Sequence, residues 1–317
     1  MHLKNWIPYK LIFEPDQALC RWLHIGDIPF SEPFFDDTIL KCKSLSRQTL
    51  HVAGNIELLP DWSKQIDAVA PTAFIFHISR CGSTLLSQLL GINPEHIVLS
   101  EVPFFDEILR APFKKHSQAQ FQQEDKLQAA VQFYGQQRNG KEQRLFIKAD
   151  SWHVFFYPML RKLYPDVPFI LLYRKPEEVI RSQQKKRGMQ AVPGVIEPEV
   201  FGFKKEPVTD LDAYMARVIE RYLELFLEIS EKDERSLLVN YNDGMMKVME
   251  QMADFTGIDI SDDYAQMETR CRYNAKYPDQ VFQEQQSAEE LPEYIKKCAE
   301  LYGELEERKG TRVFRIF

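Results

Sequence analysis

The stretch PTAFIFHISRCGSTLLSQLL, residues 71–90, decides the fold that this chain is expected to adopt. It begins with a short apolar run, Ala73 to Ile78, of the kind that forms a buried strand. A tight turn of mostly small and polar residues follows, from Ser79 to Thr84. The leucines after the turn recur at helical spacing and predict a helix; they are Leu85, Leu86, Leu89 and Leu90.

The turn at residues 79–84 is well suited to bind an anion. A turn between a strand and a helix directs backbone N–H groups and the positive end of the helix dipole at one point. Gly82 lets a ligand approach the main chain closely, and the hydroxyls of Ser83 and Thr84 add donors. Arg80 adds a permanent charge with a planar set of donors. These features predict a site for a phosphate or a group of similar shape.

The spacing differs from that of the common phosphate loop, G-x-x-x-x-G-K-[ST], because no lysine precedes Ser83. The segment SRCGSTLL instead resembles the loop [SP]-R-[SC]-G-[ST]-[ST]-L-[LM] of the carbohydrate and tyrosylprotein sulfotransferases. These enzymes use 3′-phosphoadenosine 5′-phosphosulfate (PAPS). The alternative is an ordinary polar turn. The resemblance implies that the 5′-phosphosulfate is held by Ser79, Arg80, Cys81, Gly82, Ser83 and Thr84.

A second element, LLYRKPEEVIRSQQ, follows another predicted strand. Pro176 is placed at a helix start, where its missing N–H costs nothing. Arg174 and Ser182 are eight residues apart and match the R-x-P-x-x-x-x-x-S element of sulfotransferases. The resemblance implies that they hold the 3′-phosphate of the nucleotide. Alone, the element would be interpreted as a surface arginine and a solvated helix serine, but it follows the first element in the expected order.

Transfer of a sulfuryl group to an alcohol needs a group that accepts the hydroxyl proton. Glu101 in SEVPFF ends a predicted strand and resembles the glutamate of the tyrosylprotein branch, so we predict it as the general base. Lys148, which closes RLFIK, resembles a lysine that these enzymes place near the transferring group. The alternatives are a helix-capping or ion-paired glutamate and a surface lysine. His153 is expected to cap or pack, and His77 to be a satisfied core residue.

Three further correspondences are weaker. Tyr241 lies where the family often has a tyrosine in a Y-E-D-like turn, but the turn here reads YND, with Asn242 in place of the glutamate. ERKGTR, residues 307–312, superficially resembles an R-K-G element of cytosolic sulfotransferases and lacks the residues that normally follow. Lys276 is a further candidate for reaching the nucleotide. Of these, only Tyr241 is included in the predicted nucleotide site.

Beyond residue 71, apolar runs alternate with helical patterns, which predicts a parallel sheet with helices on both faces. The resemblance makes this the P-loop-like sulfotransferase fold, at residues 71–317. Residues 1–70 are expected to form a small β-rich module, in which SEPFFDDTI is a turn leading into a strand. Its core is expected to consist of the aromatic residues Trp6, Trp22, Phe34, Phe35 and Trp62. The segment 184–210 has no clear period and is expected to be a long loop. The predicted strands of the main sheet are residues 73–78, 96–100, 144–148, 167–173 and 236–241.

Composition limits the other possibilities. The chain of 317 residues has 40 Lys and Arg against 47 Asp and Glu, a net charge of −7, which opposes non-specific nucleic-acid binding. The five cysteines are scattered, and no paired carboxylates accompany the loop, so neither a disulfide framework nor a metal is expected. Without a signal-peptide pattern or an apolar run long enough to span a bilayer, the chain is expected to be cytoplasmic and not bound to a membrane.

The predicted function is therefore PAPS-dependent sulfotransfer to a hydroxyl or amine, leaving 3′-phosphoadenosine 5′-phosphate (PAP). The acceptor, a small molecule, a carbohydrate or a peptide, is not identified by the sequence, because acceptor pockets are built from variable loops such as 102–125 and 184–210. Two alternatives stay open. One is a nucleotide-dependent phosphoryl transferase or kinase on a related fold, which the missing loop lysine and metal ligands oppose. The other is a non-catalytic nucleotide-binding module.

Overall fold

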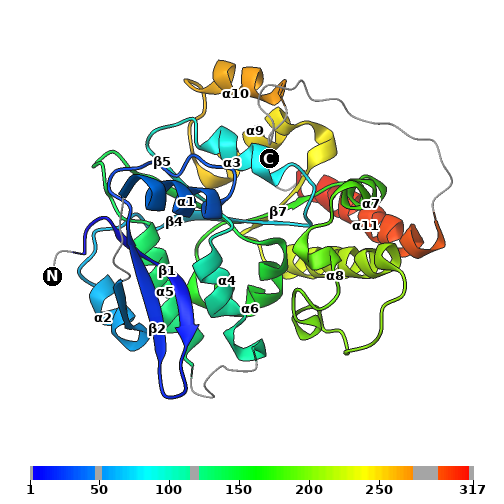
Figure 1. Cartoon of the computed structure of the whole chain (residues 1–317). Coiled ribbons are helices and arrows are strands. Elements are labelled where there is room, and N and C mark those ends of the chain that lie inside the picture. Colours follow the sequence, from blue (N-terminus) through cyan, green and yellow to red (C-terminus); the bar gives the residue numbers. More distant parts are fainter. Residues whose placement is uncertain (1–2, 47–51, 115–120, 274–291, 314–317) are drawn as a thin grey trace. The chain divides into compact units, whose positions relative to one another are not determined.

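The structure is a computed structural model that describes residues 3–46, 52–114, 121–273 and 292–313 (Figure 1). The chain divides into two compact units, and the division falls inside a strand. Unit 1 consists of Met1–Phe74 and Leu90–Val167, and unit 2 of Ile75–Leu89 and Pro168–Phe317. The domain boundary that the sequence suggests at residue 70 stays a prediction.

A five-stranded parallel sheet runs through the fold in the order β5-β6-β4-β7-β8. Its strands are β4 (Pro71–His77), β5 (His96–Ser100), β6 (Arg144–Lys148), β7 (Phe169–Tyr173) and β8 (Ser236–Asn240). All five residues of β7 and the last five of β4 are buried, as expected for strands covered on both faces. The predicted parallel sheet is confirmed, and each predicted strand lies within two residues of the observed one.

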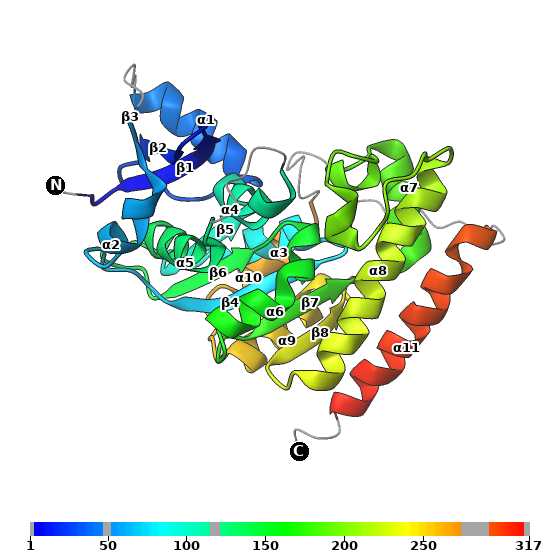
Figure 2. The ribbon, with the colours of Figure 1, turned by 90° about the horizontal axis from the view of Figure 1, so that it is seen from below.

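Helices account for most of the remaining described chain. Those of unit 1 are α1 (Phe35–Ser46), α2 (Leu59–Ser63), α4 (Pro103–Leu109), α5 (Gln123–Tyr134) and α6 (Tyr157–Leu163). Those assigned to unit 2 are α3 (Ser83–Leu90), α7 (Pro176–Lys185), α8 (Leu211–Lys232), α9 (Met245–Thr256), α10 (Tyr264–Cys271) and α11 (Lys296–Val313). In unit 2, α8 and α11 lie side by side (Figure 1 and Figure 2). α9 ends at Gly257, which has φ +67° and closes the helix as predicted.

The N-terminal region has the predicted β-rich character. Three antiparallel strands form a second sheet: β1 (Trp6–Phe13), β2 (Ala18–His24) and β3 (Val52–Asn55). The strand predicted at SEPFFDDTI is wrong, because the chain enters helix α1 at Phe35. Phe35, Ile39 and Cys42 recur at helical spacing and are buried, and Asp36 and Asp37 in the first turn favour the helix N-terminus.

Helix α5 and the residues after it hold this N-terminal region within unit 1. The Tyr134 hydroxyl donates to the Pro8 carbonyl at 2.6 Å, and Gln136 Nε2 donates to the Trp6 carbonyl at 2.8 Å. Among the aromatic residues expected in this core, Trp22 and Phe35 are buried. Trp6, Phe34 and Trp62 are only partly buried. The half-buried Phe34 ring lies 5.4 Å from the ammonium of Lys148.

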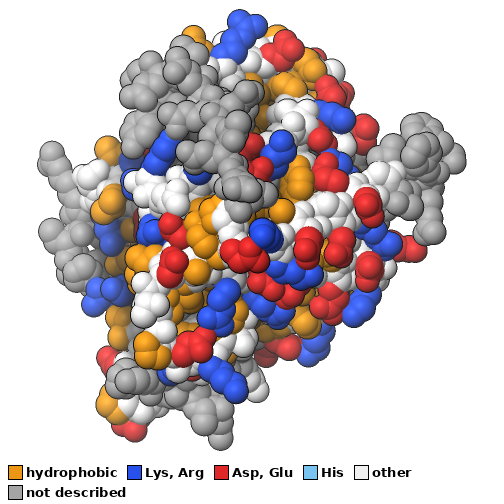
Figure 3. Space-filling model, turned by 90° about the vertical axis from the view of Figure 1, so that its right-hand side faces the viewer, with side chains coloured by type: hydrophobic (Ala, Val, Ile, Leu, Met, Phe, Trp, Pro, Cys, Tyr) orange, Lys and Arg blue, Asp and Glu red, His pale blue; other side chains and the backbone are white. Residues whose placement is uncertain are grey.

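The long loop predicted at residues 184–210 is confirmed, since it contains only the short 3-10 helices η4 (Met189–Ala191) and η5 (Pro198–Phe201) outside the end of α7. On the side that carries α8 and α11, acidic and basic side chains are interspersed (Figure 3). Within α8, Lys232 and Glu228 form an exposed ion pair of 2.9 Å. Within the described parts of the chain, no helix combines the length and apolar character needed to cross a bilayer.

Candidate functional site

The loop after β4 has an unusual backbone. Ser79 and Arg80 have φ values of +66° and +50°, and Gly82 has +83°. Left-handed conformations are costly for residues with a side chain and persist where the surrounding structure holds them. The Ser79 N–H donates to Nδ1 of the buried His77 at 3.1 Å, so His77 is a satisfied core residue as predicted. Helix α3 then begins at Ser83.

Gly82 is required by its surroundings as well as by its backbone angle. A Cβ atom at this position would lie 2.3 Å from Cδ2 of Tyr241 and 2.8 Å from Cε of Met245. These distances are far below van der Waals contact, so the Tyr241 ring occupies the space of a side chain at position 82. The loop and the residue that follows β8 are therefore packed against each other within unit 2.

Arg174, which follows β7, belongs to the same group. Its Nη1 donates to the Arg80 carbonyl at 3.4 Å, and its guanidinium lies over the Tyr241 ring, 4.5 Å from the centroid. Its Nε also pairs with Glu178. Ser182, the other predicted ligand of the 3′-phosphate, lies half-buried in α7. The structure thus brings Arg174, Arg80, Gly82 and Tyr241 together.

Gln183 also contacts this loop, although the sequence analysis did not identify it. This fully buried side chain donates from Nε2 to Ser79 Oγ at 3.2 Å and accepts at Oε1 from the Gly188 N–H at 2.7 Å. Arg80 donates to the Lys186 carbonyl. The beginning of the 184–210 loop is therefore tied to the loop after β4. In the sequence, the one signal for Gln183 was its position directly after Ser182.

The other predicted loop residues differ in what they expose. Ser83 and Thr84 are buried in the first turn of α3, with exposed fractions of 5% and 9%. Cys81 is fully buried, and its Sγ donates to the Leu172 carbonyl at 3.5 Å. The Cys81 side chain therefore packs into the sheet, which leaves the loop backbone at this position as the part able to meet a ligand.

In unit 1, Glu101 and Lys148 lie at the ends of the adjacent strands β5 and β6. Glu101 has φ +57°, and its N–H donates to the Lys148 carbonyl at 2.8 Å. Glu101 Oε1 and Lys148 Nζ form an ion pair of 2.7 Å. Lys148 is 1% exposed and its ammonium lies 5.4 Å from the centroid of the Phe34 ring. Lys148 is therefore a buried partner of Glu101 and of the N-terminal region, not a surface lysine.

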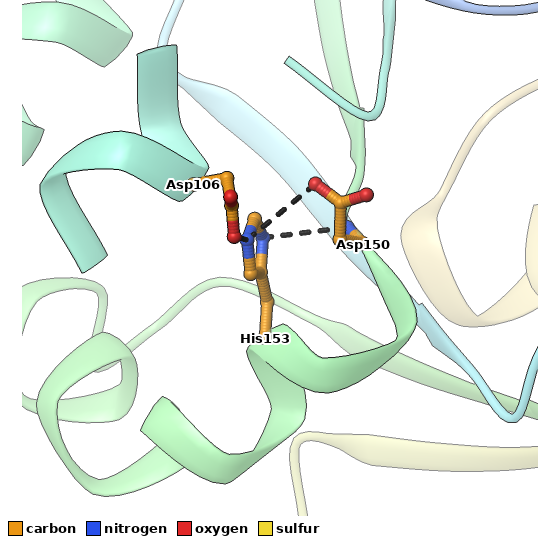
Figure 4. A group of neighbouring side chains, drawn as sticks. All are labelled: Asp106, Asp150 and His153. Atoms are coloured by element: carbon orange, nitrogen blue, oxygen red, sulfur yellow. Dashed lines mark hydrogen bonds and ion pairs between the residues drawn. The ribbon is translucent and has the colours of Figure 1, made fainter. Parts of the chain in front are cut away.

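Next to this pair lies a cluster of Asp106, Asp150 and His153 (Figure 4). His153 Nε2 is 3.1 Å from Asp106 Oδ1 and 3.5 Å from Asp150 Oδ2, and the Asp150 N–H donates to His153 Nδ1 at 3.3 Å. His153 therefore both caps and packs, as predicted. Asp106 also accepts from Trp152 Nε1 at 2.6 Å and from Arg110 Nη1 at 2.8 Å.

The two carboxyl groups of the cluster have opposite pKa shifts. Burial acts to raise the pKa of Asp106, but the contacts with His153, Arg110 and Trp152 lower it below its usual value. Burial, reinforced by the charges of Glu101 and Asp106, raises the pKa of Asp150 well above its usual range. When two neighbouring carboxyl groups have such different environments, one is ionised and the other is neutral.

The three side chains have the donor types of a metal site, since their ligand atoms lie within 4.8 Å of one another. Both oxygens of Asp106 are already hydrogen-bonded, to Trp152 and Arg110, and a guanidinium beside the carboxylate opposes a second cation. The arrangement therefore favours a hydrogen-bonded network. The sequence patterns predict no metal and point to neither Asp106 nor Asp150. The one sequence signal for Asp150 is its position two residues after the end of strand β6.

The predicted residues fall into two groups. The loop residues, Arg174, Ser182 and Tyr241 belong to unit 2, whereas Glu101 and Lys148 belong to unit 1. Residues 307–312 lie in α11, where Lys309 pairs with Asp243 at 2.8 Å. Lys276 falls outside the described residues.

The model of the sulfotransferase family matches residues 71–263, more than half of the chain. No curated protein matches it. The sulfotransferase domain from the curacin biosynthetic pathway is similar at 18% identity, over 63% of this chain and 78% of that one, with a TM-score of 0.43. Sulfotransferase STF9 from Mycobacterium avium is similar at 12% identity, over 88% and 84% of the two chains, with a TM-score of 0.47.

Proposed function

Since the chain belongs to the sulfotransferase family, we propose that it transfers the sulfuryl group of PAPS to a hydroxyl or amine of an acceptor. The observation that carries this proposal is the left-handed loop from Ser79 to Gly82, held against Tyr241 and Arg174. Such a backbone directs N–H groups toward an anion, and the adjacent guanidinium is the side chain best suited to a phosphate. The proposal includes no metal.

Unit 2 would hold the nucleotide. The backbone N–H groups of the loop, with the hydroxyls of Ser83 and Thr84, suit the 5′-phosphosulfate. Arg174 and Ser182 suit the 3′-phosphate, and the Tyr241 ring supports the guanidinium that makes this contact. Arg80 is assigned to the charge that develops on the transferring group, as arginine does in phosphoryl transfer.

Unit 1 would supply the base. As the acceptor oxygen bonds to sulfur, the bond between sulfur and the bridging oxygen of the donor breaks, and PAP leaves with the electron pair. The acceptor proton passes to the Glu101 carboxylate and then to solvent. Lys148 neutralises this carboxylate across 2.7 Å in the resting protein. Its further role at the bridging oxygen stays a prediction.

Calorimetric titration of the metal-free protein with PAP tests the nucleotide site, with ATP and Mg²⁺ as the comparison. We expect micromolar binding of PAP, weakened by about 10-fold to 100-fold in Arg174→Ala, because a charge-assisted hydrogen bond contributes about 1.5 to 3 kcal/mol. Arg217→Ala, which removes an exposed arginine of the same unit paired with Glu206, is the matched control. Binding of ATP with Mg²⁺ but not of PAP would favour a phosphoryl transferase. If the protein binds neither nucleotide, the result would favour a non-catalytic module.

If PAP binds, ³⁵S-labelled PAPS can be offered with a panel of small-molecule, carbohydrate and peptide alcohols and amines. Label in any acceptor establishes sulfotransfer and identifies the acceptor class. PAP binding without transfer to any member of a broad panel would instead support a non-catalytic nucleotide-binding module.

A further inference from the structure

Three carboxyl groups and two cations lie close together in unit 1, and the cations are already paired. Lys148 Nζ is 2.7 Å from Glu101 Oε1, and Arg110 Nη1 is 2.8 Å from Asp106 Oδ2. The third carboxyl, Asp150, is only 8% exposed, and among the residues that the structure describes no Lys or Arg pairs with it. The Asp150 carboxyl accepts one hydrogen bond, from the backbone N–H of His153 in a capping box. A buried carboxylate with one hydrogen bond and no paired cation is still costly, so this group needs a proton.

His153 is the remaining neighbour able to carry a positive charge, and its hydrogen bonds argue against the charged form. Its Nδ1 accepts from the Asp150 backbone N–H at 3.3 Å, so this nitrogen carries no proton. Its Nε2 is then the protonated nitrogen of a neutral imidazole and donates to Asp106 Oδ1 at 3.1 Å. His153 therefore supplies no positive charge to offset a carboxylate at Asp150.

We propose that Asp150 is a neutral carboxylic acid in the resting protein and acts as a positioning residue for the ion pair of Glu101 and Lys148. Its place in catalysis rests on the proposed function, whereas its protonation does not. With Asp150 neutral, the charge of Lys148 is directed to Glu101 alone. With Asp150 ionised, a second carboxylate two residues away along the chain competes for the same ammonium.

The surroundings of Asp150 support the neutral form. The facing groups are Glu101 after β5, Asp106 on α4, Arg110 directly after α4, Lys148 on β6 and His153 in the 3-10 helix η3 (Ser151–Phe156). Burial and the two carboxylates raise the pKa of Asp150, and the two cations only partly oppose this effect.

The proton has a measurable effect on stability. Because the folded-state pKa of Asp150 is raised, the folded protein binds one more proton than the unfolded chain between the ordinary aspartate range and the raised value. This group then makes the protein less stable as the pH rises through that window. One proton corresponds to about a tenfold increase in the unfolding equilibrium constant per pH unit.

Denaturant unfolding from about pH 4 to pH 8 tests the proposal without an acceptor or a donor. We expect Asp150→Asn to lose this single-proton slope relative to the wild-type protein, and Asp61→Asn, which changes an aspartate with a side chain 74% exposed, to keep it. Parallel curves for the wild-type protein and Asp150→Asn would overturn the proposal. So would a stoichiometric divalent metal in the purified wild-type protein that is lost in Asp150→Asn, because a cation would then replace the proton.

Should Asp150→Asn fail to fold, NMR of protein with ¹³C-labelled aspartate provides the same test. An aspartate carboxyl still protonated near about pH 7 is expected in the wild-type protein and in Asp36→Asn, which removes another aspartate with a raised pKa. If the spectra show no protonated aspartate carboxyl at this pH, the proposal is overturned.

In transfer assays, turnover of the wild-type protein is expected to fall on the alkaline side as Asp150 ionises. Turnover of Asp150→Asn is expected to lack this fall. A merely structural role for Asp150 would leave the pH profile unchanged.

Discussion

The loop in unit 2 and the charged cluster in unit 1 are built on different principles. The loop relies on backbone shape, since Ser79, Arg80 and Gly82 are left-handed and the Tyr241 ring fills the space beside the glycine. The charged cluster, taken here as Asp106, Asp150 and His153 with the adjacent pair of Glu101 and Lys148, relies on side-chain charges that compensate one another. The difference teaches that a loop whose backbone N–H groups converge is suited to binding an anion, whereas a carboxylate paired with a cation is suited to accepting a proton. Changes in the two regions should therefore affect different steps.

The largest effect is expected for Glu101→Gln, which removes the proposed base but keeps an oxygen that accepts from Lys148. Turnover of ³⁵S-labelled PAPS with the responding acceptor should fall by about 100-fold to 10,000-fold, the usual contribution of a general base. PAP affinity, measured by calorimetry, should stay within a few-fold of the wild-type value because the residues proposed to bind the nucleotide are in unit 2.

Unchanged turnover in Glu101→Gln would remove this residue from the mechanism. An equal loss of turnover and PAP affinity would remove the distinction between the two regions. Thermal unfolding serves as the control, because removing one partner of a buried ion pair can destabilise the fold.

A smaller effect is expected for Gly82→Ala. The added Cβ would lie 2.3 Å from the Tyr241 ring at a φ of +83°, so the loop or the ring must move. PAP affinity should fall by about tenfold or more, since a loss of about 1.4 kcal/mol is already tenfold. Gly202→Ala is the matched control, because this glycine of unit 2 also has a positive φ, +74°, but no atom within 4 Å of the added Cβ. Equal losses in both variants would mean that backbone strain, and not the packing of Tyr241, controls the loop.

The smallest effect is expected for Gln183→Met, which removes the hydrogen bonds to Ser79 and Gly188 while keeping the volume of the side chain. The free energy of unfolding should fall by about 1 to 3 kcal/mol, the cost of leaving buried polar groups unpaired, and PAP affinity by a few-fold. Gln184→Met, which loses only a surface hydrogen bond to Asp212, should change neither quantity appreciably. If the two variants behave alike, Gln183 does not support the loop.

The sequence was most informative where local pattern and function coincide. The apolar run before Ser79 and the leucines after it identified a strand, a turn and a helix, and the structure has these elements at β4 and α3. It was least informative in residues 1–70, where a predicted strand is helix α1. Short apolar segments with aromatic residues suit either element, and only packing of one face against the core decides between them.

Pairing of charges was also beyond the sequence. Lys148 at a strand end has the pattern of a surface lysine, yet it is buried against Glu101 and Phe34, which precede it by 47 and 114 positions. Asp106 and Arg110 are partners on one helix turn, but nothing in their spacing indicates that they lie beside Asp150 and His153. Such clusters depend on contacts between distant segments, which no local pattern records.

The sequence by itself determined the parallel sheet and the strand-to-helix turn that we propose binds an anion, because hydrophobic periodicity and small residues in such a turn act over a few neighbouring residues. Tertiary structure alone decided that Tyr241 occupies the space beside Gly82, that Gln183 supports Ser79 and that Asp150 is buried among charges. The physical reason is that close packing and desolvation depend on which side chains meet in three dimensions.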